Sequence, residues 1–172
     1  MQNPTLYAHS PQYFHSFFDL VQTNDLLYEL EKSGEFTANL FRNIPADMEN
    51  YAYALYKWTI KEVLRHIIDC ERIFAYRAFR FSRFDPIELA GFDEDMYIEN
   101  AKSIDQNLSE LVLEFETVRN ATISLFKPMT EEMLDFKGTA NQLSLSARSI
   151  GFMAVGHNLH HANFVNSHYL NN

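Results

Sequence analysis

The segment GHNLHHANF, residues 156–164, places three histidines within five positions of the chain. Two of them, His157 and His161, are four residues apart, so a helix of about 3.6 residues per turn presents both on one face. Ile150 and Phe164 fall on the same stripe, which indicates that the two imidazoles point toward the core. Because burying an imidazole without a partner is costly, both side chains are expected to bind something.

A third histidine occupies a comparable position on an earlier helix. His66 lies near the middle of the apolar face of residues 59–79. In a helical bundle, inward side chains of two helices meet, and metal sites are built in this way. Three neutral imidazoles suit Zn²⁺, Ni²⁺ or a similar divalent ion and leave a coordination position for water or substrate. The pattern therefore favours an open metal site of His66, His157 and His161, with satisfied core histidines as the alternative.

The other histidines are not expected to be ligands. His160 is rotated by about 100° from His161 and points toward the edge of the stripe. His9 falls in a predicted tail, and His15 falls in a short aromatic segment rich in ordinary core residues. His168 follows His161 at a separation of about 10 Å along the helix axis, which is too far to join the same ion.

Residues near His66 offer a fourth ligand and acid–base groups. Cys70 lies one turn beyond His66 and would close the site as in structural zinc sites, but a small buried residue is the favoured interpretation. Asp69 could orient an imidazole, with a surface carboxylate as an equal alternative. No dedicated general base is apparent, and the candidates are Asp69, Glu71 and Asp95.

Arg77 and Arg80 are candidate substrate-binding residues on the same helix. Arg77 lies roughly 16 Å beyond His66 along the axis, so it shares the face of His66 but cannot touch the ion. Together the two guanidinium groups could bind a carboxylate of a long substrate. Ion pairing with Glu71, Asp85 or the acidic loop that follows is the favoured alternative.

The elements that must position these side chains are predominantly helical. A T-x-x-E capping box opens at Thr59, and Asn107 and Pro128 mark the two ends of a later helix. Gly34 costs about 1 kcal/mol relative to Ala inside a helix and predicts an irregularity there. Four long amphipathic helices predict an all-α four-helix bundle with a short extra N-terminal helix. The expected helices are residues 25–42, 59–79, 107–127 and, from Ser144 or Ser146, up to about Tyr169, with short ones from the Ser10–Pro11 cap to Val21 and after Thr130.

The segment Ser82–Ser103 does not follow this pattern. It mixes Pro, Gly, acidic and aromatic residues without a sustained period, and more than about 15 irregular residues inside a compact domain are unusual. A long irregular loop is therefore expected between the second and third helices. It is either a lid or binding loop, with Tyr97 as a candidate substrate contact, or a crossover. In the crossover alternative, Phe84, Leu89, Phe92 and Tyr97 pack over one end of the bundle.

Length and composition limit the class of protein. The chain of 172 residues is 47% hydrophobic, enough for one domain over residues 1–172 with a single core, of which residues 1–10 are expected to be a tail. A formal charge of -9 argues against nucleic-acid and anionic-membrane partners. No signal peptide or membrane-spanning run is expected, and a lone cysteine fits the reducing cytoplasm. An aromatic content of 15% predicts apolar patches that a homodimer would cover.

Three segments carry a resemblance to a known family: KWTIKEVLRHIIDCERIFAYRAFRFSR, GFDEDMYIENA and GHNLHHANF. Their order within residues 13–170 resembles the DinB-like superfamily, especially its YfiT-type metal-dependent hydrolases. The resemblance implies a four-helix bundle, a homodimer and a divalent metal held by His66, His157 and His161. It also implies a small-molecule substrate, because some relatives are transferases or isomerases that use a low-molecular-weight thiol. The function expected is a metal-dependent hydrolase or thiol S-transferase, with a non-catalytic metal-binding structural or stress-response protein as the alternative.

Overall fold

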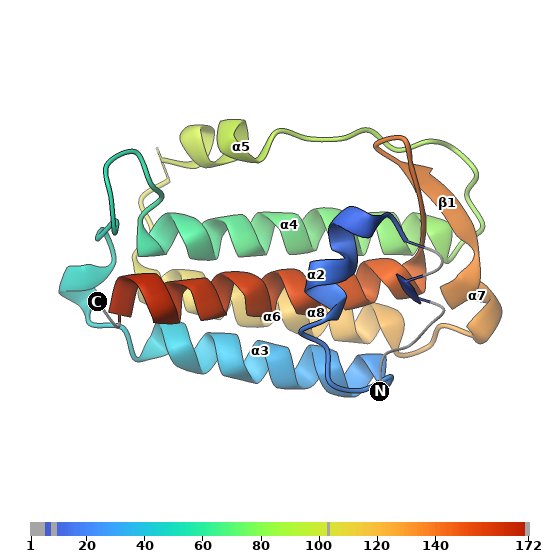
Figure 1. Cartoon of the computed structure of the whole chain (residues 1–172), viewed down its shortest axis with the longest axis horizontal. Coiled ribbons are helices and arrows are strands. Elements are labelled where there is room, and N and C mark those ends of the chain that lie inside the picture. The colour runs from blue at the N-terminus through green and yellow to red at the C-terminus, as the bar shows by residue number, and fades with distance from the viewer. Residues whose placement is uncertain (1–5, 8–9, 103, 171–172) are drawn as a thin grey trace.

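The computed structural model describes residues 6–7, 10–102 and 104–170, and four long helices form a bundle within them (Figure 1). Helices α3 and α4 each pack against both α6 and α8, so α3 and α4 occupy opposite corners of the bundle. The predicted all-α four-helix bundle is confirmed. The four helices are α3 (Leu26–Arg42), α4 (Ile60–Phe81), α6 (Leu108–Phe126) and α8 (Ala147–Val165).

Side-chain caps set where these helices begin. Asp25 caps α3, Thr59 opens the predicted capping box of α4, and Asn107, the predicted start of α6, opens a capping box as well. Ser146, the second of the two predicted starts, caps α8, and the predicted short helix is α7 (Glu131–Asp135). Each cap accepts a hydrogen bond from a backbone N–H that has no partner inside the helix, which is worth about 1 kcal/mol. Among the described residues, no helix is both long enough and apolar enough to cross a membrane.

The connection between α4 and α6 is a long crossover. Because these two helices run in the same direction, the chain between them must return along the length of the bundle (Figure 1). The crossover contains a helix, α5 (Glu94–Ala101), which packs alongside α4 and is capped by Asp93. The segment is thus a crossover, one of the two expected alternatives, although Glu94–Ala101 is helical rather than irregular. Four of its residues were expected to pack over one bundle end. Of the four residues expected to pack there, Leu89 is buried, Phe92 and Tyr97 are half-buried and Phe84 is exposed.

A small β-hairpin precedes α8. Strands β1 (Lys137–Ala140) and β2 (Leu143–Ser146) are antiparallel, and Asn141 and Gln142 between them have φ angles of 50° and 62°. Two consecutive positive φ values are typical of a type I′ turn. Leu89 of the crossover pairs with the end of β1, so the hairpin and the crossover are joined. Sequence analysis missed this hairpin because each strand has four residues and the turn lacks glycine.

The N-terminal segment packs on the outside of α8. It forms η1 (Gln12–Phe14) and α2 (His15–Phe18), and α2 ends before the predicted limit. The predicted cap is absent, because Pro11 occupies the cap position and makes no side-chain hydrogen bond. A Cβ on Gly156 would lie 2.2 Å from the carbonyl oxygen of Phe17, so only glycine lets α2 approach α8 this closely.

The predicted tail is described only in part. Leu6 is buried in the core, and the Tyr7 hydroxyl donates a hydrogen bond of 2.8 Å to Asp19. These residues therefore pack on the bundle, contrary to the expectation. Residues 1–5 and 8–9 lie outside the described part of the chain.

The buried apolar side chains form two clusters. One cluster includes Leu30, Phe74 and Ile150, and the other includes Phe41 and Phe115. This arrangement differs from the predicted single core. Seven buried polar residues of the four long helices are called the polar belt here: Ser33, Thr37, His66, Glu71, Arg119, His157 and Asn158.

Arg119 joins α6 to two other helices within the polar belt. Its Nε and Nη2 atoms donate to the two oxygens of Glu71 at 2.7 and 2.8 Å. Its Nη1 donates to the carbonyl of Leu30 and to the hydroxyl of Ser33, both at 2.7 Å. A Cβ on Gly34 would lie 2.9 Å from Cγ of Arg119, so glycine makes room for this side chain. Helix α3 continues through Gly34, and the predicted irregularity was wrong.

Candidate metal centre

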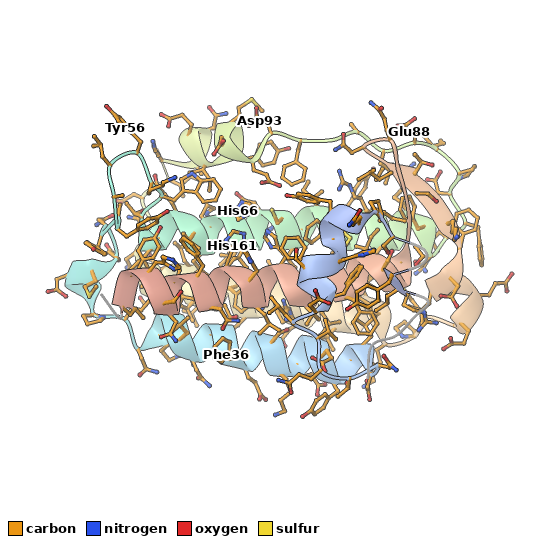
Figure 2. All side chains as sticks on the ribbon, viewed as in Figure 1. Phe36, Tyr56, His66, Glu88, Asp93 and His161 are labelled. Atoms are coloured by element: carbon orange, nitrogen blue, oxygen red, sulfur yellow. The ribbon has the colours of Figure 1, made fainter. Side chains whose placement is uncertain are left out.

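The structure brings together the three histidines that the sequence predicted as ligands. His66 of α4 and the pair His157 and His161 of α8 lie side by side, and Figure 2 shows His66 and His161 between the two helices. Nε2 of His66 is 3.0 Å from Nε2 of His157 and 3.2 Å from Nε2 of His161. One nitrogen from each ring lies within 4.8 Å of the other two. We call these three residues the histidine cluster.

The spacing of these nitrogens fits a shared metal ion. Zn–N bonds of 2.0–2.1 Å in a tetrahedral site separate two ligand nitrogens by about 3.3–3.4 Å, close to the distances found here. A neutral imidazole has one N–H donor, so three nitrogens that converge on one point cannot satisfy one another. A divalent cation would accept all three lone pairs. Among the described residues, no second group of three His, Cys, Asp or Glu side chains converges in this way.

Burial keeps the histidine cluster neutral and able to donate lone pairs. It lowers the pKa of His66 to about 4. Burial, followed by repulsion from His66 and His160, lowers the pKa of His161 to about 3. The pKa of His157 is also lowered, first by burial and then by its histidine neighbours. Protons therefore compete little with a metal ion at neutral pH.

The metal-free protein is expected to lose stability as the pH falls below 6.5. The folded-state pKa of His66 is about 4, below its ordinary 6.5, so the unfolded chain binds more protons within this range. The free energy of unfolding keeps the full contribution of neutral His66 above pH 6.5. This contribution, about 3 kcal/mol, is lost as the pH falls from 6.5 toward the folded-state pKa. Denaturant titrations of chelator-treated wild type and His66→Leu at about pH 7.5 and 4.5 measure it. Equal pH dependence in both proteins would contradict the prediction.

Two cavities border the histidine cluster: all three histidines line the larger one, and His161 alone of the three lines the smaller one. The larger cavity, about 500 Å³, also contains Arg77, and the smaller one, about 410 Å³, contains Asp95. Trp58, His160 and His161 line both cavities. A small molecule therefore has room to reach the cluster from either cavity.

Aromatic rings shield the cluster from water. The ring of Trp58 lies 4.7 Å from that of His66, and Phe17 and Phe74 each pack edge-on against His157 at 5.6 Å. Sequence analysis did not identify Trp58 or Phe17 as part of the site. The contacts come from the loop before α4 and from α2, and no local pattern predicts that these segments meet α8.

Cys70 is not placed as a fourth ligand. Its Sγ lies 3.7 and 3.8 Å from the two ring nitrogens of His66, but it is not among the atoms that converge with His157 and His161. Burial is the main cause that raises the pKa of the thiol, so Cys70 stays protonated in the metal-free protein. The favoured interpretation of Cys70 as a small buried residue matches its 1% exposure.

Two of the three predicted base candidates lie away from the cluster. Asp69 lies 3.8 Å from both Arg65 and Arg72 and forms no hydrogen bond with a described histidine. Glu71 is held by Arg119, so its predicted pairing with Arg77 was wrong. Of the three predicted base candidates, Asp95 alone lines a cavity that His161 of the cluster also lines.

The larger cavity holds an acidic residue that sequence analysis missed. Glu94 lines it, and partial desolvation, then Asp95 and Asp93, raises the pKa of Glu94. The signal that could have found it is the acidic first turn of α5, which a prediction of irregular chain concealed.

The three candidate substrate-binding residues differ in their positions. Arg77 is buried and lines the larger cavity with the histidine cluster. Arg80 instead donates hydrogen bonds to Asp85, as predicted, and to the hydroxyl of Tyr76. Tyr97 packs on the ring of Phe92, which lines the larger cavity, but Tyr97 itself does not line it.

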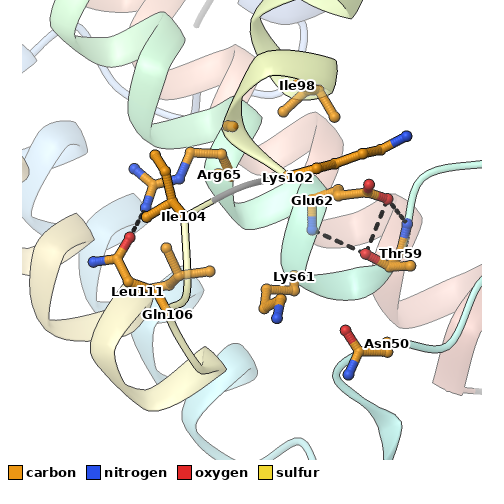
Figure 3. A pocket seen from close by; sticks show the side chains of 11 residues that line it. Asn50, Thr59, Lys61, Glu62, Arg65, Ile98, Lys102, Ile104, Gln106 and Leu111 are labelled. Atoms are coloured by element: carbon orange, nitrogen blue, oxygen red, sulfur yellow. Dashed lines mark hydrogen bonds between the residues drawn. The ribbon is translucent and has the colours of Figure 1, made fainter.

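A third pocket, near the start of α4, contains no histidine (Figure 3). Its volume is about 180 Å³, and Lys61, Arg65 and Lys102 give it a basic lining. Arg65 donates to Gln106 within the pocket and to Glu114 at 2.9 Å, so its charge is already paired. This pocket is not a candidate active site.

Replacing His15 and His168 is expected to leave metal binding unchanged. Nε2 of His15 lies 3.1 Å from the carbonyl of Tyr7, and His168 stacks on Phe164. Neither joins the histidine cluster, and the third predicted non-ligand, His9, lies outside the described residues. Metal analysis of the protein with His9, His15 and His168 all changed to Gln checks the prediction, and loss of the tightly bound ion would contradict it.

Comparisons with known proteins agree with the fold. No curated protein sequence matches this chain. YfiT from Bacillus subtilis, described as a probable metal-dependent hydrolase with an unusual four-helix bundle topology, is a similar solved structure, with a TM-score of 0.73, 15% identity and 83% and 82% of the two chains covered. A DinB-like protein from Bacillus subtilis, YjoA, is similar with a TM-score of 0.61, 18% identity and coverage of 83% and 88%. The family model of the DinB superfamily matches residues 29–165. The chain therefore belongs to the DinB superfamily.

Proposed function

We propose that this protein is a metal-dependent hydrolase that acts on a small molecule. The observation that carries the proposal is the convergence of three neutral imidazoles, two buried and one half-buried, beside two cavities. The description of the structurally similar YfiT as a probable metal-dependent hydrolase supports the same class of reaction. Because YfiT is only 15% identical to this chain, the proposal rests mainly on the three histidine ligands of this chain and less on the structural similarity.

The metal proposed is Zn²⁺ or Ni²⁺, held by His66, His157 and His161. When bound, such an ion would supply Lewis acidity and lower the pKa of a coordinated water, or stabilise a substrate thiolate. Trp58 and Phe17 cover part of the cluster through their ring contacts with His66 and His157. Asp95 and the exposed His160 are the groups placed to move a proton, at a carboxylate oxygen and at an imidazole nitrogen respectively.

Two other functions remain as alternatives to hydrolysis. A transferase that uses a low-molecular-weight thiol would employ the same histidine cluster and the larger cavity. A non-catalytic structural or stress-response role would call for a closed site with four protein ligands. The position of Cys70 outside the convergent set and the cavities beside the cluster favour an enzyme.

The proposed function is tested by comparing the Zn²⁺- and Ni²⁺-loaded protein with the chelator-treated protein on small esters, amides and electrophiles. Each assay is run with and without a low-molecular-weight thiol. The expected result is metal-dependent turnover that His66→Ala abolishes and His15→Gln preserves. Turnover that survives chelation, or that His66→Ala retains, would overturn the proposal.

A homodimer in the cytoplasm is the proposed state of the protein. Tyr13, Leu55 and Tyr56 remain 77%, 79% and 94% exposed, and exposed apolar side chains favour association. Light scattering of the purified protein is expected to give twice the chain mass. A species of 20.1 kDa at micromolar concentration would contradict this prediction.

A further inference from the structure

Arg77 is a buried cation without a carboxylate partner. Its side chain belongs to α4, and the residue is 7% exposed. Its Nη2 donates one hydrogen bond, of 2.9 Å, to the carbonyl of Ala90, and its guanidinium lies 5.7 Å from the ring centroid of Phe92. Every Asp and Glu of the chain belongs to the described residues, and none of them forms an ion pair with Arg77.

The other buried arginines show how this protein normally satisfies such a charge. Arg119 is 3% exposed and is paired with Glu71, and Arg65 is 9% exposed and is paired with Glu114. Removing a cation from water is costly unless an anion or several acceptors replace the water. Burial also lowers the pKa of Arg77, because removal from water disfavours the charged form of the guanidinium. Arg77 is therefore the exception that needs an explanation.

The position of Arg77 supplies that explanation. It lines the cavity of about 500 Å³ that also contains the histidine cluster. The same lining includes the apolar side chains of Phe74, Phe92, Leu145 and Met153. Glu94 lines the same cavity but stays exposed and does not neutralise the guanidinium.

We propose that Arg77 binds an anionic group at one end of the substrate, while the histidine cluster lies at the reacting end. The substrate class is an elongated molecule with an apolar middle and a terminal carboxylate or phosphate. The residue separation of Arg77 and His66 on α4 corresponds to roughly 16 Å of backbone along the axis. This is an upper limit for the length of the substrate, because the charge of Arg77 acts on Cys70, which lies beside His66. This inference deepens the proposed function and rests on it for the reacting end only.

The first test is a stability measurement that needs neither metal nor ligand. Arg77→Gln keeps a donor for Ala90 but removes the unpaired charge, so its Tm should stay within about 4 °C of wild type or rise above it. Arg80→Gln on the same helix is the matched control, because its partner Asp85 is solvent-accessible. A fall of more than about 4 °C in Arg77→Gln would assign Arg77 a structural role and overturn the proposal.

The second test measures anion recognition in metal-free protein. Wild type should bind 4-phenylbutyrate at least about tenfold more tightly than neutral 4-phenylbutanamide, since a charge-assisted hydrogen bond contributes that much. The preference should vanish in Arg77→Gln, return in part in Arg77→Lys and persist in Arg80→Gln. The matching phenylalkyl phosphonate shows whether carboxylate or phosphate is preferred. Equal binding of acid and amide, or a preference that Arg77→Gln retains, would overturn the proposal.

A third measurement separates this inference from the proposed function. Hydroxamates of increasing chain length that end in a carboxylate or in its methyl ester are titrated into Zn²⁺-loaded protein. An acid preference at one chain length, lost in Arg77→Gln, supports the anion site and gives its distance from the metal. Tight binding of both series without an acid preference overturns the anion site alone. If neither series binds and the 4-phenylbutyrate preference stands, the metal-dependent function fails while the anion site holds.

Discussion

Alanine at His66, His157 or His161 should lower the affinity for Zn²⁺ or Ni²⁺ by more than about 100-fold. Each substitution removes one of three converging nitrogens, and two imidazoles are too few to hold the ion tightly. Wild-type protein should also gain about 2.7 kcal/mol of stability when free metal is a hundred times Kd. The three variants should lose this dependence of Tm on metal. Calorimetric titration and thermal unfolding of the metal-free proteins measure the two effects.

His160→Ala is the matched control on the same helix. The His160 ring lies 5.0 Å from that of His161 and is exposed, but its nitrogens do not join the convergent set. Metal affinity should therefore persist in this variant, whereas turnover should fall if His160 moves a proton. Loss of binding in His160→Ala together with retention in His161→Ala would show that the ligand pair on α8 has been misassigned.

Arg119→Met should destabilise the protein by about 3–5 kcal/mol, because it leaves the buried carboxylate of Glu71 without its partner. The side chains of Arg119 and Glu71 are 4% and 3% exposed, so water cannot replace the lost hydrogen bonds. The substitution also leaves the carbonyl of Leu30 without this donor. Denaturant unfolding at neutral pH measures the loss.

The double variant Glu71→Met with Arg119→Met is the control for this prediction. Apolar residues in place of both charges remove the uncompensated carboxylate, and such replacements are often neutral. The double variant should therefore be more stable than Arg119→Met alone. A loss below about 1 kcal/mol in Arg119→Met, the range of an exposed pair, would contradict the burial of this ion pair.

The polar belt links this ion pair to the histidine cluster. Asn158, which follows the ligand His157, donates to the carbonyl of Ser33 at 3.3 Å, and Ser33 also accepts from Arg119. Glu71 is one residue beyond Cys70 on the helix that carries His66. Because these bonds tie all four helices at the level of the cluster, they hold α4 and α8 at the separation that the three nitrogens require.

Much of the fold could be predicted because its signals are local. Caps such as Thr59, Asn107 and Ser146 mark helix starts within a few residues, and apolar periodicity shows which face is buried. The convergence of His66 with His157 and His161 was predictable for the same reason. Each lies on an inward stripe, and a bundle brings inward stripes together.

The remaining features depend on contacts between distant segments. The pairing of Glu71 with Arg119, and hence the loss of Glu71 as a base, depends on which helix covers the far side of α4. Helix α5 was concealed because its apolar period is short and its acidic residues resemble a loop. The sequence could not predict that Arg77 lacks a carboxylate partner, because Asp85 and the acidic crossover follow it closely along the chain. In the structure Asp85 pairs with Arg80, and Arg77 donates only to the carbonyl of Ala90.

X-ray absorption spectroscopy of the untagged, metal-loaded protein tests the central claim most directly. The account predicts one ion per chain with three imidazole nitrogens at about 2.0–2.1 Å, at least one further oxygen ligand and no sulfur. His66→Ala should lose this spectrum and His160→Ala should retain it. A sulfur ligand at about 2.3 Å, which would make Cys70 the fourth ligand of a closed site, or the absence of a stoichiometric ion would contradict the account.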